Sequence, residues 1–222
     1  MHVTVISSPE VGLQAIRSIG EWAEGIEFAY AWVSTDRGKA AHWKALPLGK
    51  VTRAVVGTQF AQTEPWVLRE LDEKTGCLRV VIDSVGTFHP KVILGFLDQN
   101  VRAFVGSANF TPAAFSRNAE LGILLDGQRS DAAISEIIQF VDRYWQEGKP
   151  LDHEWLDRYT LAWKRRPRPA GTVPLASAQA AGIDDLDIPW DAYYRLIKHQ
   201  EGRKLASGYK LSVFNPEESY LT

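Results

Sequence analysis

The sequence predicts an α/β fold, with a mixed, largely parallel sheet that is flanked by helices on both faces. The chain has 222 residues, of which 45% are apolar and 23% charged, an ordinary globular composition. Its first two thirds alternate short apolar, β-branched runs with amphipathic stretches, the pattern of strands connected through helices. The length accommodates one domain of about 150 to 200 residues plus an appendage.

The first strand, helix and second strand have the clearest local pattern. Residues 3–6 form a short β-branched run that predicts a strand. Ser8 is then a candidate N-cap with Pro9 at the first helical position, and apolar residues keep helical spacing up to Gly25. Residues 26–33 predict the next strand.

The rest of the core follows the same alternation. A helix is expected over residues 64–72, and another begins at Ser130 or Asp131 and continues to about residue 144. Further strands are predicted at residues 51–56, 78–82, 92–97, 101–105 and 121–125.

The domain organisation changes after Gly148. We expect a core domain over residues 1–148, followed over 149–222 by a helical extension, a proline-rich linker and a tail. Residues 151–163 have helical spacing, whereas 164–179 contain three prolines among small residues. A targeting module is expected either C-terminal to this arm or on a separate protein.

Charge and cysteine content limit the functional classes. Lysine and arginine total 25 against 27 acidic residues, a net charge of −2, so positive charge for a nucleic-acid partner must be local. The single cysteine, Cys77, excludes an intramolecular disulfide and fits a reducing compartment. With no apolar run near 20 residues, we expect a cytoplasmic protein without a membrane partner.

The densest positive run lies near the end of the expected core extension. Its basic residues are interleaved with Tyr159 and Trp163, a combination that can hold a nucleic-acid backbone by charge and stacking. The alternative, which we favour, is a solvated helix end that runs into a linker. The basic residues of the run are Arg158, Lys164, Arg165, Arg166 and Arg168.

Residues that can carry chemistry gather between Phe88 and Leu125. His89 and Lys91 are two apart at the start of a predicted strand, so their side chains project to the same face. An ammonium beside an imidazole suits a phosphodiester: Lys91 neutralises a nonbridging oxygen while His89 attacks phosphorus or protonates the leaving oxygen.

The ends of the next two strands add polar groups to the same place. Gly106 lets the backbone approach a ligand, and Ser107 and Asn109 supply uncharged donors. Thr111 and Pro112 predict a short helix whose amide groups face an anion. Before the last strand, Glu120 is placed to accept a hydrogen bond from His89, and Asn118 either contacts the site or only caps the chain.

These residues resemble the signature of the phospholipase D superfamily, a His-x-Lys followed by a Gly-Ser-x-Asn. Here the two elements are His89-Pro90-Lys91 and Gly106-Ser107-Ala108-Asn109, with a downstream glutamate. The family also has an aspartate five residues after the lysine, where this chain has Phe96, with Asp98 nearby. Several nuclease-type members lack that aspartate too, so the resemblance favours the branch that includes catalytic domains of metal-independent restriction endonucleases.

The resemblance implies an activity and an assembly. Two motifs make one active centre in this family, and this chain has one, so a homodimer would bring two copies of His89 to a shared phosphate. One histidine would form a phosphohistidine while the other acts as general acid. The implied protein is an endonuclease that hydrolyses DNA, or RNA, without metal or other cofactor. A lipid or small-phosphodiester hydrolase or transferase, and an inactive phosphate-binding relic, are the alternatives.

A metal site is the competing chemical interpretation. None of its possible ligands has the His-x-x-x-His or comparable spacing of a metal motif, and zinc is hard to reconcile with Lys91. Surface or half-buried positions are expected for the four histidines without a partner motif, which are His2, His42, His153 and His199. The possible ligands are His42, His89, Asp98, Glu120 and His153.

Overall fold

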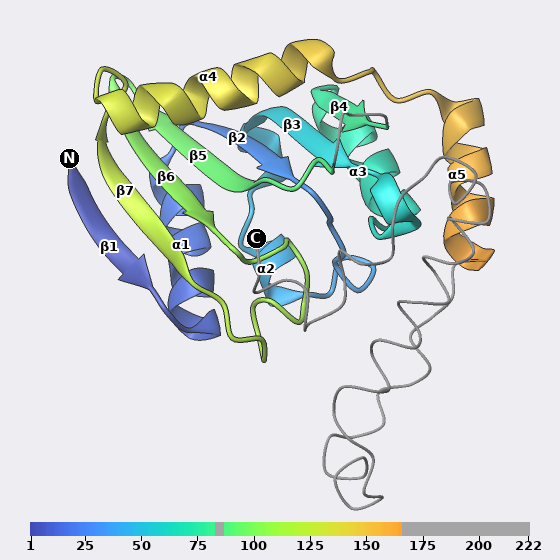
Figure 1. Ribbon diagram of the computed structural model, residues 1–222, viewed down its shortest axis with the longest axis horizontal. Coiled ribbons are helices and arrows are strands. Elements are labelled where there is room, and N and C mark those ends of the chain that lie inside the picture. Colours follow the sequence, from blue (N-terminus) through green and yellow to red (C-terminus); the bar gives the residue numbers. More distant parts are fainter. Residues whose placement is uncertain (83–86, 166–222) are drawn as a thin grey trace, which may run out of the picture. The chain divides into compact units, whose positions relative to one another are not determined.

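Figure 1 shows a computed structural model of the protein, which describes residues 1–82 and 87–165. They form a seven-stranded sheet in the order β1-β7-β6-β5-β2-β3-β4. The strands are β1 (His2–Ile6), β2 (Gly25–Tyr30), β3 (Val51–Gly57), β4 (Leu78–Val81), β5 (Lys91–Leu97), β6 (Asn100–Gly106) and β7 (Gly122–Gln128). The helices are α1 (Pro9–Trp22), α2 (Ala41–Lys44), α3 (Pro65–Thr75), α4 (Ala132–Glu147) and α5 (His153–Arg165), with 3-10 turns η1 (Leu48–Lys50) and η2 (Gln59–Ala61).

The sheet is mixed, as predicted, but the expectation that it is largely parallel was wrong. Only β2 with β3 and β3 with β4 pair in parallel. The other four neighbouring pairs are antiparallel. Between β5 and β6 the chain reverses in two residues, with Asp98 in the left-handed region at φ 52°. So short a connection can join only antiparallel strands, because a parallel pair needs a crossover.

Helix α1 begins where the sequence predicts. The Ser8 side chain accepts a hydrogen bond from the Val11 backbone N–H at 3.3 Å, and Pro9 occupies the first turn. Ile16 and Ile19 on its inner face are fully buried. Glycine at position 95 of β5 is needed for this packing, since a Cβ there would lie 2.6 Å from the Ile19 side chain.

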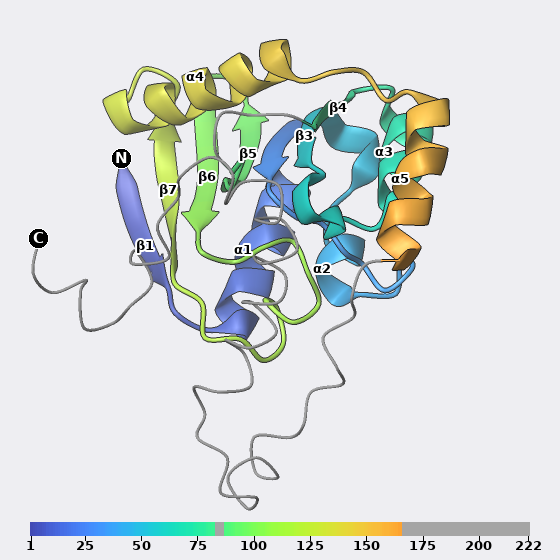
Figure 2. The same cartoon turned by 45° about the vertical axis from the view of Figure 1, so that its right-hand side comes forward.

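Helices cover both faces of the sheet, which confirms the predicted layers. Ile16 of α1, Leu68 of α3 and Leu156 of α5 belong to one hydrophobic core. Ile134 and Val141 of α4 belong to a second core, on the opposite face. Figure 2 shows α4 running along the top, across the strands. Within the described ranges, no helix combines the length and apolar character needed to cross a bilayer.

Two boundaries differ from those expected. The second strand ends at Tyr30, because Val33 leaves the ladder and makes an isolated bridge to Phe110. The compact unit continues past the boundary expected at Gly148 and includes α5. Helix α5 is held to it by Tyr159, whose hydroxyl donates to the Thr63 carbonyl at 2.8 Å. The predicted linker and tail, residues 167–222, lie outside the described residues.

Candidate active site

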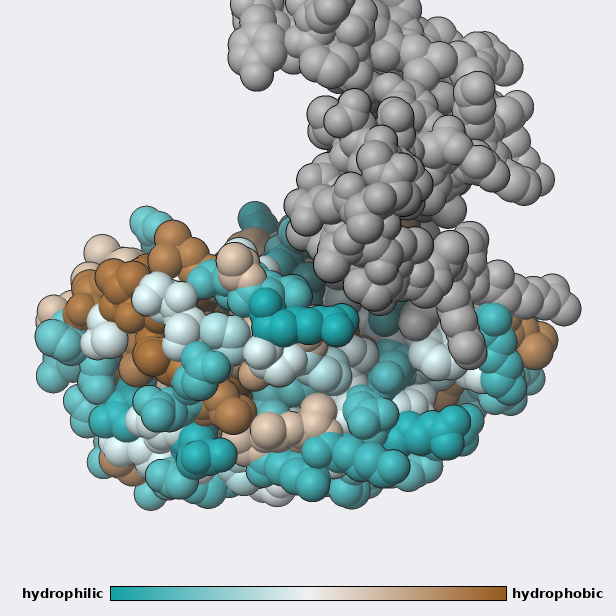
Figure 3. Space-filling view, turned by 90° about the horizontal axis from the view of Figure 1, so that it is seen from below, coloured by the Kyte–Doolittle hydropathy of each residue, from teal (hydrophilic) through white to brown (hydrophobic). Residues whose placement is uncertain are grey.

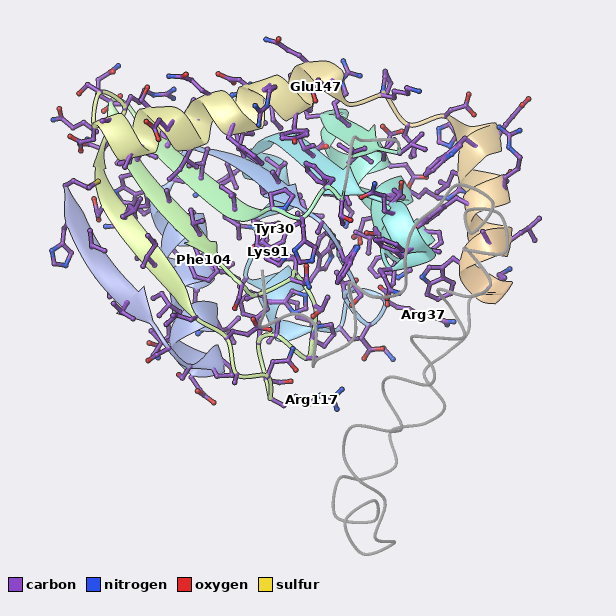
Figure 4. The ribbon with its side chains drawn as sticks, viewed as in Figure 1. Tyr30, Arg37, Lys91, Phe104, Arg117 and Glu147 are labelled. Atoms are coloured by element: carbon purple, nitrogen blue, oxygen red, sulfur yellow. The ribbon has the colours of Figure 1, made fainter. Side chains whose placement is uncertain are left out.

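The predicted site residues meet at one edge of the sheet. Lys91 begins β5, Gly106 ends β6 and Glu120 lies just before β7. Antiparallel pairing aligns these three ends, with Val92 opposite Val105 and Gly106 opposite Gly122. Figure 4 shows Lys91 in the middle of the molecule beside Tyr30, its neighbour on β2. The topology therefore brings together groups that are up to 31 residues apart, from His89 to Glu120.

His89 and Lys91 form a close pair. The Lys91 Nζ lies 2.9 Å from His89 Nδ1 and 3.2 Å from Nε2, and it donates to the His89 carbonyl at 3.0 Å. Lys91 is only 7% exposed, whereas His89 is exposed. An ammonium has only donors, so the imidazole nitrogen that it faces must be an acceptor. The geometry thus favours a neutral His89 whose ring lone pair faces the Lys91 ammonium.

Burial and charge act in the same direction on His89 and in opposite directions on Lys91. Burial lowers the pKa of His89, and the positive charge of Lys91 lowers it further. Burial also lowers the pKa of Lys91, while the Glu120 carboxylate opposes this by favouring the ammonium. The imidazole is therefore easier to keep unprotonated than a free histidine, as a nucleophile at phosphorus requires.

Glu120 has other partners than the one predicted. Its carboxylate accepts hydrogen bonds from Ser107 Oγ at 2.5 Å and from Asn118 Nδ2 at 3.0 Å. Ser107 Oγ also accepts from the Leu121 backbone N–H at 3.0 Å. In the part of the chain that the structure describes, the expected bond from His89 to Glu120 is absent. Ser107 and Asn118 supply the donors for this carboxylate, which therefore connects the end of β6 to the segment before β7.

Gly106 is explained by strand packing and not by room for a ligand. A Cβ at this position would lie 2.7 Å from both the Gly122 Cα and the Leu121 carbonyl oxygen. The ends of β6 and β7 approach too closely there for any side chain. The predicted role of Gly106 is therefore corrected: it brings Ser107 next to Glu120.

The short helix expected at Thr111 and Pro112 is replaced by consecutive turns over residues 112–117. The backbone N–H groups of Ser116, Arg117 and Asn118 all donate to one acceptor, the Ala113 carbonyl. In a helix each carbonyl would take its own donor, so these converging bonds end the turn instead of propagating it. The Thr111 hydroxyl still accepts from the Ala114 N–H at 3.4 Å, as a cap does.

Asn109 lies on the inner side of the same loop. Its Oδ1 is buried and has no hydrogen-bond partner among the described residues. The adjacent Phe110 anchors the loop, since its N–H donates to the Trp32 carbonyl and its carbonyl accepts from Ser34. A buried amide with an unsatisfied oxygen is costly, and such groups are concentrated at sites that bind something.

Two aromatic residues that the sequence did not single out as site residues lie beside His89. The Trp32 ring is 4.9 Å from the imidazole in an edge-on arrangement, and the Lys91 ammonium is 5.9 Å from the indole. Phe60 also contacts the indole edge-on, at 6.4 Å between ring centroids. Only the pairing of β2 with β5 brings Trp32 here, so no local sequence pattern identifies it.

His42 is a second histidine near the site, but it belongs to the core. It is 1% exposed, which corrects the expected surface or half-buried position. Its ring stacks on Phe115 at 5.2 Å, and Nε2 bonds to the Ser34 carbonyl at 3.0 Å. Burial lowers the pKa of His42 to about 4, so it is neutral at physiological pH and supports the loop from behind.

The position of the family aspartate, five residues after Lys91, lies at the opposite end of β5. Phe96 is 6% exposed in the core, beneath the Arg129 guanidinium, and Asp98 lies in the turn. Lys91 and Asp98 are separated by the length of the strand, so neither residue substitutes for an aspartate at the site. Over residues 1–82 and 87–165, no three His, Cys, Asp or Glu side chains form a group that could hold a metal.

The structure describes only part of the basic run of residues 158–168. Arg158 on α5 is exposed and lies 4.0 Å from Glu154, and Lys164 is also exposed. Arg166 and Arg168 lie outside the described residues. Its role in nucleic-acid binding stays a prediction.

Comparison with known proteins places the fold. No protein-family model and no curated protein matches the sequence. Among solved structures, the phospholipase D family member Nuc from Salmonella typhimurium is 22% identical, with a TM-score of 0.53 over 68% of this chain and 97% of that one. NucT from Helicobacter pylori is 17% identical, with a TM-score of 0.49 over 68% and 99% of the two chains. A phosphatidylserine synthase from Haemophilus influenzae is also 17% identical, with a TM-score of 0.49 over 81% and 44%. The likeness to Nuc shows that the chain has the fold of the phospholipase D superfamily.

Proposed function

We propose that the protein is a metal-independent phosphodiesterase of the phospholipase D type, a nuclease that hydrolyses DNA or RNA. The observation that carries this proposal is the buried Lys91 ammonium, 2.9 Å from the ring of an exposed histidine whose pKa is lowered. A fixed positive charge next to a neutral imidazole is what in-line attack on a phosphodiester needs.

The reaction has two steps. A His89 nitrogen attacks phosphorus, a phosphorus–nitrogen bond forms, and the bond to the leaving oxygen breaks. The His89 of the partner copy, in its protonated form, gives its proton to that oxygen. In the second step, the same partner imidazole takes a proton from water, whose oxygen attacks phosphorus and releases His89. The products are one alcohol and one phosphomonoester.

The other polar side chains take supporting roles. Lys91 and Asn109 hold the nonbridging oxygens, and Ser107 assists from the strand end. Glu120 stabilises the site in two ways: it fixes Ser107 and Asn118 by hydrogen bonds, and its charge favours the ammonium form of Lys91. A polyanion is further attracted by Arg37 and Arg117, which extend from loops in Figure 4 and have no ion pair within the described ranges.

An uncovered apolar surface supports the shared site. Val5 is 61% exposed and Leu121 is 64% exposed, and Val3 and Ile123 beside them are also exposed. Val5 lies opposite Ile123 in the ladder, so both side chains are on one face of the sheet. In Figure 3, apolar side chains gather on the left, where Figure 1 shows β1 and β7. Leu121 follows Glu120 directly, so a second copy on this face would lie next to the site.

Trapping of the intermediate tests the reaction. The wild-type protein, quenched in alkali during turnover of an oligonucleotide with an internal 32P phosphate, should carry label on His89. The His89→Ala protein should carry none, and EDTA should leave the wild-type rate unchanged. Loss of activity in EDTA, or cleavage by the His89→Ala protein, would contradict the mechanism.

Co-expression tests the shared centre. When wild-type and His89→Ala chains assemble at random in equal amounts, only about a quarter of the dimers keep both histidines. The activity of the mixture should fall to that fraction of an equal amount of wild-type dimer. A fall to one half would mean that each chain works alone.

A further inference from the structure

Phe60 combines two costly features at one exposed position. It has φ 59° and ψ 13°, and Ala61 after it has φ 50°, so two non-glycine residues are left-handed in succession. Side chains with a Cβ are strained in this region, and aromatic residues rarely adopt it. The Phe60 ring is also 50% exposed. Strain and apolar exposure at one residue are typical of functional sites.

The segment around Phe60 is held in place by hydrogen bonds on both sides. Before it, the Thr58 hydroxyl donates to the Val81 carbonyl at 3.2 Å. After it, the Thr63 hydroxyl donates to the Gly57 carbonyl at 2.6 Å. The Gln59 side chain accepts from the Phe88 N–H at 2.8 Å. The strained conformation is therefore imposed by the surrounding structure and presents the ring in a defined position.

The same contacts connect Phe60 to the reacting groups. Gln59 is bonded to the residue that directly precedes His89. The Trp32 indole contacts both Phe60, at 6.4 Å, and His89, at 4.9 Å. Trp32 thus connects the imidazole with Phe60, whose half-exposed ring offers an apolar aromatic surface.

We propose that Phe60 is a stacking platform for a nucleobase of an unpaired strand, next to the phosphate that His89 attacks. This inference rests on the proposed function, which places a phosphodiester at His89 and Lys91. Every base has a π-face that stacks on an aromatic ring regardless of its identity. A base inside a duplex has both faces covered by its neighbours, so a platform beside the scissile phosphate selects single-stranded substrate without selecting sequence.

Binding measurements separate stacking from chemistry. The inactive His89→Ala protein should quench the fluorescence of 2-aminopurine in a short single-stranded oligonucleotide. It should also bind that oligonucleotide about ten- to a hundredfold more tightly than the His89→Ala/Phe60→Gly protein does. Phe60→Trp should keep both the affinity and the quenching. Leu161→Ala is the matched control, since Leu161 is a similarly exposed apolar residue, at 53%, on α5.

Glycine at position 60 distinguishes a binding role from a packing role. Gly tolerates positive φ, so Phe60→Gly should be at least as stable as Phe60→Ala to thermal unfolding while losing substrate affinity. If the ring serves only to pack on Trp32, both variants lose stability and affinity for the oligonucleotide does not change. That result would overturn the inference.

Cleavage of an abasic strand distinguishes this inference from the proposed function. An oligonucleotide of tetrahydrofuran abasic units has the phosphodiesters but no bases to stack. The wild-type protein should cleave it with a kcat/KM about ten- to a hundredfold below that for the normal strand, and Phe60→Gly should remove this difference. Equal cleavage of both strands by the wild type would overturn the stacking site and leave the proposed function intact. Cleavage of neither would overturn the proposed function, and the binding measurements would still decide the inference.

Discussion

Two histidines, one at the sheet edge and one in the core, show how position decides what an imidazole does. Burial lowers the pKa of both His89 and His42. His89 is exposed at the sheet edge and faces an ammonium, whereas His42 is 1% exposed between Phe110 and Phe115. Burial thus lowers the pKa of one imidazole that stays accessible at the sheet edge and of another that is packed inside the core. Substitutions at and around the two histidines test this contrast.

The largest expected effect is the loss of activity at the exposed histidine. His89→Ala should lower phosphodiesterase activity by about 10⁴-fold or more, because no other group can replace a lost nucleophile. Its melting temperature should stay near that of the wild type, since His89 is exposed. His42→Ala is the matched control, and it should lose stability instead, with activity per folded molecule retained. A large loss of stability in His89→Ala would erase the contrast between the two sites.

The next effect comes from the partner of His89. Lys91→Gln should lower kcat about 10²- to 10³-fold, as removal of one charge-stabilising donor does. Removal of the ammonium should also raise the pKa of His89 toward the ordinary value, because Lys91 contributes to lowering it. NMR titration of the imidazole protons measures this shift. If the pKa of His89 stays unchanged in Lys91→Gln, burial alone sets it.

The third prediction is a pH dependence that belongs to His42. Its pKa is about 4 in the folded protein against about 6.5 when unfolded, so the unfolded state binds more protons between these values. The contribution of His42 to the free energy of unfolding should therefore be fully present above pH 6.5. The free energy of unfolding should fall by about 3 kcal/mol as the pH falls to 4. Urea unfolding at a series of pH values measures this loss. His42→Gln should reduce the slope, and His153→Gln, at an exposed histidine, should retain it.

The smallest effect is expected at the hydrogen-bonded strand end. Ser107→Ala removes the donor to Glu120 and the acceptor of the Leu121 N–H, which should cost about 1 kcal/mol of stability. Activity should fall by no more than about tenfold, because Lys91 and His89 keep their places. Asn118→Ala, which removes only one bond to Glu120, is the milder control. A loss as large as that of Lys91→Gln would mean that Ser107 itself contacts the reacting phosphate.

The sequence predicted the site where local spacing was sufficient. His89 and Lys91 are two residues apart on an extended chain, and the cap at Ser8 acts within one turn, so both follow from neighbours in sequence. Predictions from the sequence were wrong where residues distant in sequence decide the hydrogen bonds and the packing. Glu120 bonds to Ser107 and Asn118, and Gly106 is needed for the approach of β7. Neither outcome follows from residue types, because it depends on the register of strand pairing.

By itself, the sequence determined the α/β class, the start of α1 and the residues that carry the proposed chemistry. Only the tertiary structure decided that four of the six strand pairs are antiparallel, that His42 is buried and that Trp32 and Phe60 lie beside His89. The physical reason is the range of the interactions. Caps and side-chain periodicity act over a few residues. The contacts among Trp32, Phe60 and His89 join segments from three parts of the chain, which meet only once the sheet has formed.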